Sequence, residues 1–205
     1  MPLSDGFTDI PAGKIAAIAT ILERTQPPRP DEFAVAEQFD WRFARVEAPD
    51  LDWYVDLLRR VGSSHLWYQR LIQSRDAIAD KIADPSTVIH ALSVDGRAEG
   101  IAELDLSEDR TGELVYFGVT PGLVGTGAAR FMMARLLAFA FSQPVERLWL
   151  HTNTIDHPKA MAFYRRFGFV PVRQMLELAD DPRLGGLFAR DAAPQVPLFP
   201  RPGED

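Results

Sequence analysis

The stretch from Glu113 to Ala129 constrains the fold of this chain more than any other. It predicts a strand that ends at Val119, a short loop that holds Gly125 and Gly127, and a helix that begins directly afterwards. Glycines let backbone N–H groups approach a ligand, and the first turn of a helix leaves its amides without intrahelical partners. Together they can bind an anion such as a pyrophosphate. A bare Gly-Thr-Gly can equally serve as a tight turn, so the rest of the chain must decide.

The elements around this loop predict an α+β fold. Strands are expected over 87–94, 98–106 and 112–119, and Asp95-Gly96 between the first two is a strong hairpin signal. Such a meander disfavours a Rossmann fold, and no Gly-Lys-Ser/Thr follows the glycines as a P-loop would require. A helix over 126–141, a strand over 147–152, a helix over 158–167 and a strand over 169–178 follow. This order predicts a mixed, mostly antiparallel central sheet flanked by helices.

The two ends of the chain read as additions to a main domain over residues 33–180. Residues 1–32 are expected to form an N-terminal extension that ends in a Pro-rich linker, and its apolar stretch 15–22 fits either a helix or a strand. The domain would open with extended structure over 33–46 and helices over 49–60, around Trp67 to Ile72, and over 74–83. Residues 181–205, rich in Pro and Gly, are expected to wrap the surface or fray.

Composition excludes several classes of function. The net charge of −7 and the absence of lysine runs argue against nucleic acid as a partner. The chain has no cysteine, which excludes disulfides and thiolate catalysis. The stretch 15–22 is too short to span a membrane and lacks signal-peptide features, so we expect a cytoplasmic protein without a membrane partner. No metal site is expected, because four histidines lack close metal-ligand spacing: His65, His90, His151 and His157.

A second informative stretch covers residues 157–169. Ala160, Phe163, Tyr164 and Phe167 recur on one face of a predicted helix, and Gly168 follows as its end signal. Periodicity alone favours Tyr164 as a core aromatic residue.

These two stretches, in this order, resemble the signature motifs of the GNAT superfamily of N-acetyltransferases, in a bacterial branch. Residues 124–129 are similar to its Arg/Gln-x-x-Gly-x-Gly/Ala loop, with Val124 in place of the usual Arg or Gln. Residues 157–169 are similar to its Asn-x-x-Ala-x-x-x-Tyr-x-x-x-Gly-Phe segment, with His157 in place of Asn. The resemblance covers about residues 42–178.

The resemblance implies a three-layer fold in which a splayed strand pair forms the acyl-CoA cleft, with acetyl-CoA as cosubstrate and no metal. Backbone amides would hold the pyrophosphate, because Val124 brings no polar side chain. The residues implied in cofactor binding are Phe117, Gly118, Val119, Val124, Gly125, Thr126, Gly127, Ala128, Ala129, Asn153, His157 and Ala160.

The resemblance also implies catalytic roles. Glu113 precedes Gly127 by fourteen residues, as the base glutamate does in histone acetyltransferases of this fold, although it could be an exposed strand-start carboxylate. Tyr164 would be the general acid, and His151 is an alternative base. Glu103 and Asp105 share a strand face and could bind a cationic substrate or form the solvated face of a hairpin.

An acceptor-side wall would include Trp67, and the acceptor itself would be a primary amine of a small molecule or peptide. The expected activity is transfer of an acetyl group from acetyl-CoA directly to that amine, because no cysteine can carry it. Two alternatives stay open: a non-catalytic acyl-CoA-binding sensor or interaction module on the same fold, and an enzyme that uses a different acyl group. Since dimers are common in the family, a homodimer is also to be considered.

Overall fold

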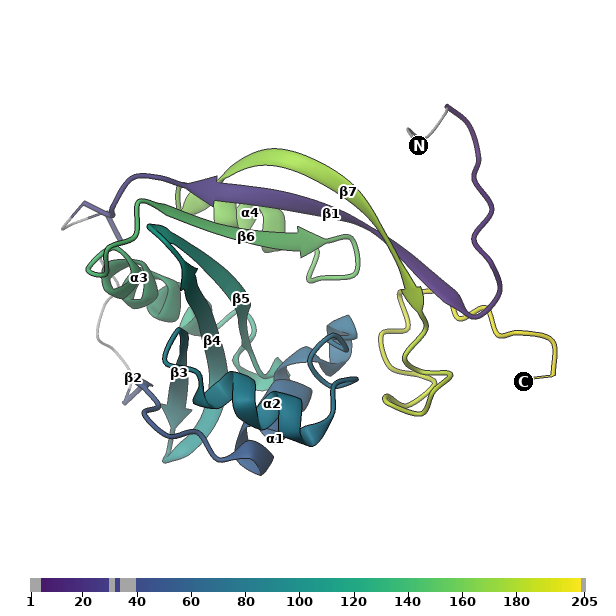
Figure 1. Cartoon of the computed structure of the whole chain (residues 1–205), viewed down its shortest axis with the longest axis horizontal. Coiled ribbons are helices and arrows are strands. Elements are labelled where there is room, and N and C mark those ends of the chain that lie inside the picture. Colours follow the sequence, from purple (N-terminus) through teal and green to yellow (C-terminus); the bar gives the residue numbers. More distant parts are fainter. Residues whose placement is uncertain (1–4, 30–31, 34–39, 204–205) are drawn as a thin grey trace.

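A seven-stranded sheet forms the centre of the computed structural model, which describes residues 5–29, 32–33 and 40–203 (Figure 1). The strand order is β2-β3-β4-β5-β6-β1-β7, and the pairing is antiparallel at each step except between β5 and β6. This confirms the predicted mixed, mostly antiparallel sheet. The strands are β1 (Lys14–Arg24), β2 (Arg42–Arg45), β3 (Thr87–Val94), β4 (Arg97–Glu108), β5 (Thr111–Val119), β6 (Arg147–Asn153) and β7 (Val170–Asp180).

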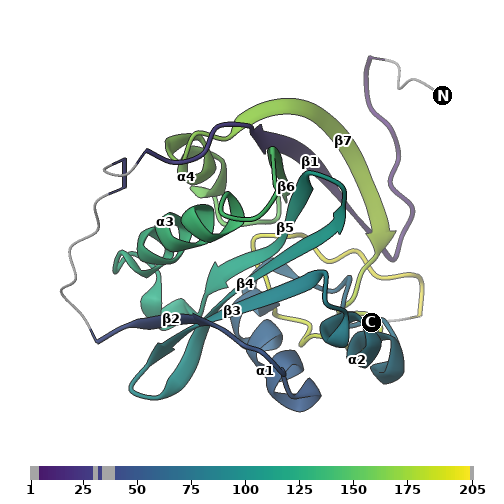
Figure 2. The ribbon, with the colours of Figure 1, turned by 60° about the vertical axis from the view of Figure 1, so that its left-hand side comes forward.

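Helices cover both faces of the sheet, so the molecule has three layers (Figure 2). The α-helices are α1 (Leu51–Gly62), α2 (Arg75–Ala83), α3 (Ala128–Ala140) and α4 (Ala160–Arg166), and the 3-10 turns are η1 (Ser63–His65) and η2 (Pro121–Leu123). One buried cluster packs α3 and α4 on the sheet, and a second packs α1 and α2 on the opposite face. Among the described helices, none combines the length and the apolar composition needed to cross a membrane.

Lys14–Arg24 lies inside the sheet, although the sequence analysis placed it in an extension outside the main domain. The segment forms β1 between β6 and β7, with Ile21 opposite His151 and Ile18 opposite Leu176. Alternate residues of its first half are buried, which resolves the open choice between helix and strand. The folded domain therefore begins near residue 14.

The helix expected around Trp67 to Ile72 does not form. The 3-10 turn η1 is followed by Leu66 in the left-handed region at φ 51°, and turns continue from there to α2. The Trp67 ring packs against Gly62 and Gly118, whose missing side chains leave room for it. Because this tryptophan packs against the sheet, residues 63–73 form a loop and not the expected helix. We call these residues the acceptor-side loop.

The C-terminal tail is anchored by a buried ion pair. Arg183 Nη2 lies 2.7 Å from Asp181 Oδ2, both side chains are almost fully buried, and the guanidinium also donates to the carbonyl of Val196. Phe188 and Ala193 of the tail pack against β1 and the acceptor-side loop. The tail therefore follows the surface, one of the two arrangements expected, and adds a small core of its own.

Candidate active site

The site forms where β5 parts from β6. The parallel ladder between them runs only from Thr111–Arg147 to Glu113–Trp149. On its other side β5 pairs with β4, but Glu103 lies opposite Tyr116 and Leu104 opposite Leu114, which leaves Val115 as the extra residue of a β-bulge. Bulges bend a strand and are frequent beside active sites. Beyond the bulge, the edge of β5 that carries Phe117, Gly118 and Val119 has no strand partner on the β6 side among the described residues.

The glycine-rich loop leads from β5 into α3 in the predicted manner. Gly125 and Gly127 have φ of +83° and +98°, a region that favours glycine. Gly127 is the N-cap of α3 and provides no capping side chain. Within the described part of the chain, the amides of Gly125, Gly127, Ala129 and Arg130 have no hydrogen-bond acceptor.

This loop has both donors and space for an anionic group. A Cβ atom placed on either Gly125 or Gly127 would meet no described atom within 4 Å. The Thr126 hydroxyl donates within the loop, to the Leu123 carbonyl at 2.7 Å. The Val124 side chain is exposed to solvent. The loop therefore fits a pyrophosphate held by backbone amides at the start of a 13-residue helix.

Asn153, His157 and Ala160 shape the turn between β6 and α4. The Asn153 side-chain oxygen accepts from the amides of Ile155 and Asp156, and His157 Nδ1 accepts from the Lys159 amide. The His157 carbonyl accepts from the Ala160 amide at 2.8 Å. The Asn153 side-chain nitrogen donates outside the turn, to Glu177 Oε2 on β7 at 3.4 Å. The part of these three residues in ligand binding stays a prediction.

Glu113 lies at the last rung before the strands separate. Its Oε1 is 4.0 Å from Nδ1 of His151, and its side chain is 27% exposed. Burial, followed by the nearby carboxylates of Asp105 and Glu108, raises the pKa of Glu113 to about 7. The cation of Lys81 is held by Asp105 at 2.6 Å and offsets only part of this. Glu113 can therefore exchange a proton near neutral pH.

Tyr164 projects from α4 into an aromatic cluster beside β5. Its ring makes edge contacts with the rings of Phe117, Phe163 and Phe169, with centroids 5.5 to 6.4 Å apart. Burial and then the charge of Asp156 raise the pKa of Tyr164 above its usual value. The phenol therefore stays protonated and can donate a hydrogen bond.

Glu103 is not presented on the surface of the site. Its carboxylate is fully buried, accepts from the Tyr54 hydroxyl at 2.5 Å and pairs with Arg70 at 2.5 Å. The same guanidinium lies 5.8 Å from the centre of the Tyr116 ring. This network ties α1, the acceptor-side loop, β4 and β5 together. Glu103 and Asp105 do share a face, but each is engaged by a cation within the protein.

Trp67 connects the two sides of the splayed strands. Its ring lies 5.4 Å from the Tyr116 ring of β5, and a Cβ on Gly118 would come within 3.0 Å of it. Its indole N–H donates to Asp156 Oδ1 at 3.3 Å, beyond the end of β6. Asp156 is a site residue that was not predicted from the sequence. Its position directly before the second motif was the available signal.

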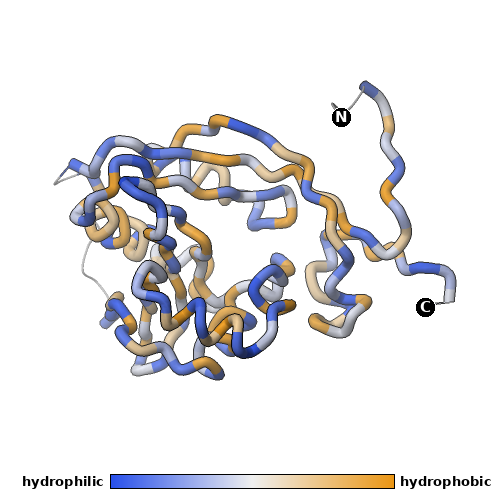
Figure 3. Tube along the Cα trace, in the orientation of Figure 1, coloured by the Kyte–Doolittle hydropathy of each residue, from blue (hydrophilic) through white to orange (hydrophobic). Residues whose placement is uncertain are grey.

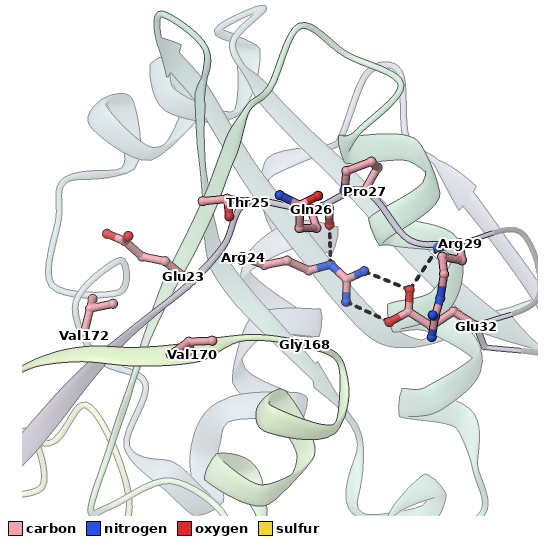
Figure 4. A pocket seen from close by; sticks show the side chains of 10 residues that line it. All are labelled: Glu23, Arg24, Thr25, Gln26, Pro27, Arg29, Glu32, Gly168, Val170 and Val172. Carbon is pink, nitrogen blue, oxygen red and sulfur yellow. Dashed lines mark hydrogen bonds and ion pairs between the residues drawn. The ribbon is translucent and has the colours of Figure 1, made fainter.

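A hollow of about 590 Å³ lies elsewhere, at the far end of α4 (Figure 4). Arg24 lines it together with Glu32, and the Arg24 guanidinium also donates to the Phe167 carbonyl and to that of Gln26. None of the predicted site residues borders this hollow, and the arginine is engaged by three partners within the protein. In the described ranges, no group of three or more histidines and carboxylates is arranged to hold a metal ion.

Solved structures share this fold. A GCN5-related N-acetyltransferase from Sphaerobacter thermophilus aligns over 81% of this chain and 52% of its own, with a TM-score of 0.59 and 16% identity. An aminoglycoside acetyltransferase from an uncultured soil metagenomic sample, in complex with sisomicin, aligns over 61% of this chain and 85% of its own, with a TM-score of 0.51 and 13% identity. At these identities the likeness establishes the fold alone.

The sequence comparisons establish the family. Over 91 residues the chain is 37% identical to uncharacterised N-acetyltransferases of Mycobacterium bovis and Mycobacterium tuberculosis. This match covers 44% of the chain and 58% of the length of those relatives. Residues 23–169, more than half of the chain, match the sequence profile of the acetyltransferase (GNAT) family. The chain therefore belongs to the GNAT family of acetyltransferases.

Proposed function

We propose that the protein is an N-acetyltransferase that moves an acetyl group from acetyl-CoA to a primary amine. One observation carries the proposal: Glu113, a carboxylate with a pKa of about 7, faces His151 at the point where β5 leaves β6. A general base works best when its pKa lies near the operating pH. The unpaired amides of the glycine-rich loop and the protonated Tyr164 lie on elements that flank the same opening.

Acetyl-CoA would be held by the backbone. The free amides at Gly125, Gly127, Ala129 and Arg130 suit its pyrophosphate, and the open edge of β5 suits the amides of its pantetheine arm. When bound, the cosubstrate supplies an activated acetyl thioester. Val124 contributes no charge, so we expect binding to depend on amide geometry in the loop.

Proton transfer would be divided between two residues. Glu113 Oε1 accepts a proton from the ammonium group of the acceptor, and His151 lies beside it as the alternative base. The amine nitrogen then bonds to the acetyl carbon while the carbon–sulfur bond breaks. The Tyr164 hydroxyl donates a proton to the departing sulfur, and the second proton that the nitrogen loses as the amide forms returns to the phenolate through solvent. The chain has no cysteine for an acyl-enzyme intermediate, so transfer is direct.

The acceptor would approach from the side of Trp67 and Tyr116. The two aromatic faces and the Asp156 carboxylate beside Trp67 favour a cationic amine over an anionic one. The aminoglycoside acetyltransferase with the same fold acts on an amine-bearing small molecule. We propose a small molecule or a peptide amine as the acceptor class.

An acyl-CoA sensor without turnover is the second candidate. It is favoured by Val124, an exposed apolar residue where the family motif has Arg or Gln, and by His157 in place of Asn. A sensor needs the glycine-rich loop but has no need for a titrating carboxylate beside the splayed strands.

Titration calorimetry with acetyl-CoA alone tests the proposal first. We expect micromolar binding, about −8 kcal/mol, and then release of free thiol with members of an amine library. Propionyl-CoA and succinyl-CoA in the same assay measure the acyl preference. Binding without thiol release for any amine would support the sensor, and no binding at millimolar acetyl-CoA would overturn both candidates.

A further inference from the structure

Strand β7 combines a free edge of the sheet with several exposed large apolar side chains. It is 11 residues long and ends the strand order. Figure 3 shows hydrophobic stretches along it, on the outermost arc of the sheet. Monomeric proteins keep edge strands short, charged or covered, because a bare edge can pair with another chain. The exposed large apolar residues here are Val170, Val172, Met175, Leu176 and Leu178, with Ile18 beside them on β1.

The two-stranded ribbon of β1 and β7 extends beyond the rest of the sheet. Lys14–Ile18 pairs with β7 alone, since β6 pairs with β1 only from Ala19 onward. One face of the ribbon is covered by the C-terminal tail. The other face exposes Ile18 and Leu176, which lie directly opposite each other, and Leu178. All of β7 and most of β1 lie outside the residues that match the family profile.

We propose that β7 pairs antiparallel with β7 of a second copy of this chain, about a two-fold axis at Met175. Directly opposite residues of an antiparallel pair point to the same face of the sheet. A two-fold axis perpendicular to the sheet keeps each side chain on its own face, so the axis must lie midway between the two copies of one residue. With the axis at Met175, Arg173 of each copy lies opposite Glu177 of the other, and opposite charges stabilise such cross-strand pairs.

Other registers are less favourable. An axis at Arg173 places two arginines opposite each other, and an axis at Glu177 places two glutamates there, both of which destabilise a strand pair. Axes at residues 174 and 176 place neither charge opposite its complement. At Met175 the two copies of Leu176 are also diagonal neighbours on the apolar face, which continues the stripe across the axis.

Glu177 is held in place for this pairing. Its Oε1 accepts from the Tyr68 hydroxyl at 2.8 Å and from Gln69 at 3.1 Å, and its Oε2 accepts from the Asn153 side-chain amide at 3.4 Å, so its three donors are neutral. No cation in the described ranges forms an ion pair with this carboxylate. Arg173 of the second copy would supply the missing charge, so the interface would border the loop that carries Trp67.

Single cysteine variants test the register, because the natural chain has no cysteine. Met175→Cys places its sulfur on the axis, where the Cα atoms of opposite residues are about 4.5–5.5 Å apart and within disulfide range. We expect a disulfide-linked dimer of the full chain after mild oxidation. Leu178→Cys is the matched control: its exposure is 48% against 41% for Met175, yet the two copies of residue 178 would lie about 20 Å apart.

Light scattering after size-exclusion chromatography tests the assembly itself. We expect twice the chain mass of 22.9 kDa, and we expect Arg173→Glu to weaken the dimer at least tenfold while Arg166→Glu on α4 does not. A monomer at the highest soluble concentration would overturn the proposal. So would equal cross-linking of the two cysteine variants, or a dimer unaffected by Arg173→Glu. None of these outcomes depends on whether the protein turns over acetyl-CoA.

Discussion

Replacement of Glu113 by glutamine tests whether Glu113 is the general base. It also measures how much the raised pKa of this carboxyl destabilises the folded protein at high pH. The change keeps the shape of the side chain and removes its charge at the last rung between β5 and β6. We expect kcat/KM to fall ~10²–10⁴-fold, the usual contribution of a general base. Acetyl-CoA affinity should not change, because backbone amides of the glycine-rich loop are expected to hold the cosubstrate.

The pH dependence follows from the pKa of about 7. The base works when ionised, so kcat/KM of the natural protein should rise as the pH rises through 7 and level off above it. In Glu113→Gln that limb should disappear.

The free energy of unfolding should rise in Glu113→Gln, whereas kcat/KM should fall. The folded protein raises the pKa of Glu113 from 4.5 to about 7, so its contribution to stability is fully present below pH 4.5 and is lost as the pH rises through 7. The difference corresponds to roughly 3 kcal/mol as an upper bound, lowered by solvent screening of a side chain that is 27% exposed. Glu113→Gln should therefore be more stable than the natural protein above neutral pH.

Thiol release across the neutral range and urea unfolding at about pH 8 measure the two effects. Asp109→Asn, an exposed carboxylate in the turn between β4 and β5, is the matched control and should change neither quantity. Natural kcat/KM in Glu113→Gln, or a retained acid limb, would refute the assignment of the base. A stability loss at high pH would refute the electrostatic argument.

Three further substitutions probe the cofactor loop, the acid and the buried network. Gly127→Val should weaken acetyl-CoA binding at least tenfold in calorimetry, because it blocks amide access at a φ of +98°, while Gly122→Val in η2 should bind normally. Tyr164→Phe should lower kcat with little change in acetyl-CoA affinity, and natural turnover would return Tyr164 to a core role. Arg70→Met should cost about 3–5 kcal/mol in urea unfolding because it leaves Glu103 buried and unpaired. Adding Glu103→Gln should recover part of that loss. If Arg70→Met left the free energy of unfolding unchanged, the buried pair would not stabilise the fold.

Features that depend on near neighbours in the sequence were predictable. Asp95-Gly96 predicted a hairpin, and both residues have positive φ, 50° and 78°, as such a turn requires. The glycine-rich loop and the start of α3 were predicted within two residues. Ser74 caps α2 as its hydroxyl accepts from the Ala77 amide. Each of these signals acts over a few residues, so the sequence carries it directly.

Partners far apart in the chain were decided by the tertiary structure. Whether Glu103 is solvated or buried depends on Arg70, which lies 33 residues away in sequence, and the pKa of Glu113 depends on strands and loops that surround it. The loop at Trp67 was predicted as a helix because its apolar spacing matches one. In the structure the Trp67 ring instead packs against Gly118 of β5, which has no side chain to exclude it.

The sequence by itself determined the α+β class, the meander, the glycine-rich loop before α3 and the motif on α4, since each follows from local spacing and turn chemistry. The tertiary structure decided where β1 lies. An alternating strand can pair with any open edge, and nothing in residues 14–24 says that the neighbours will be β6 and β7. That placement extends the sheet, leaves β7 as its apolar edge and sets Arg24 against the end of α4. Its physical reason is burial of one face against partners more than a hundred residues away, which no local pattern encodes.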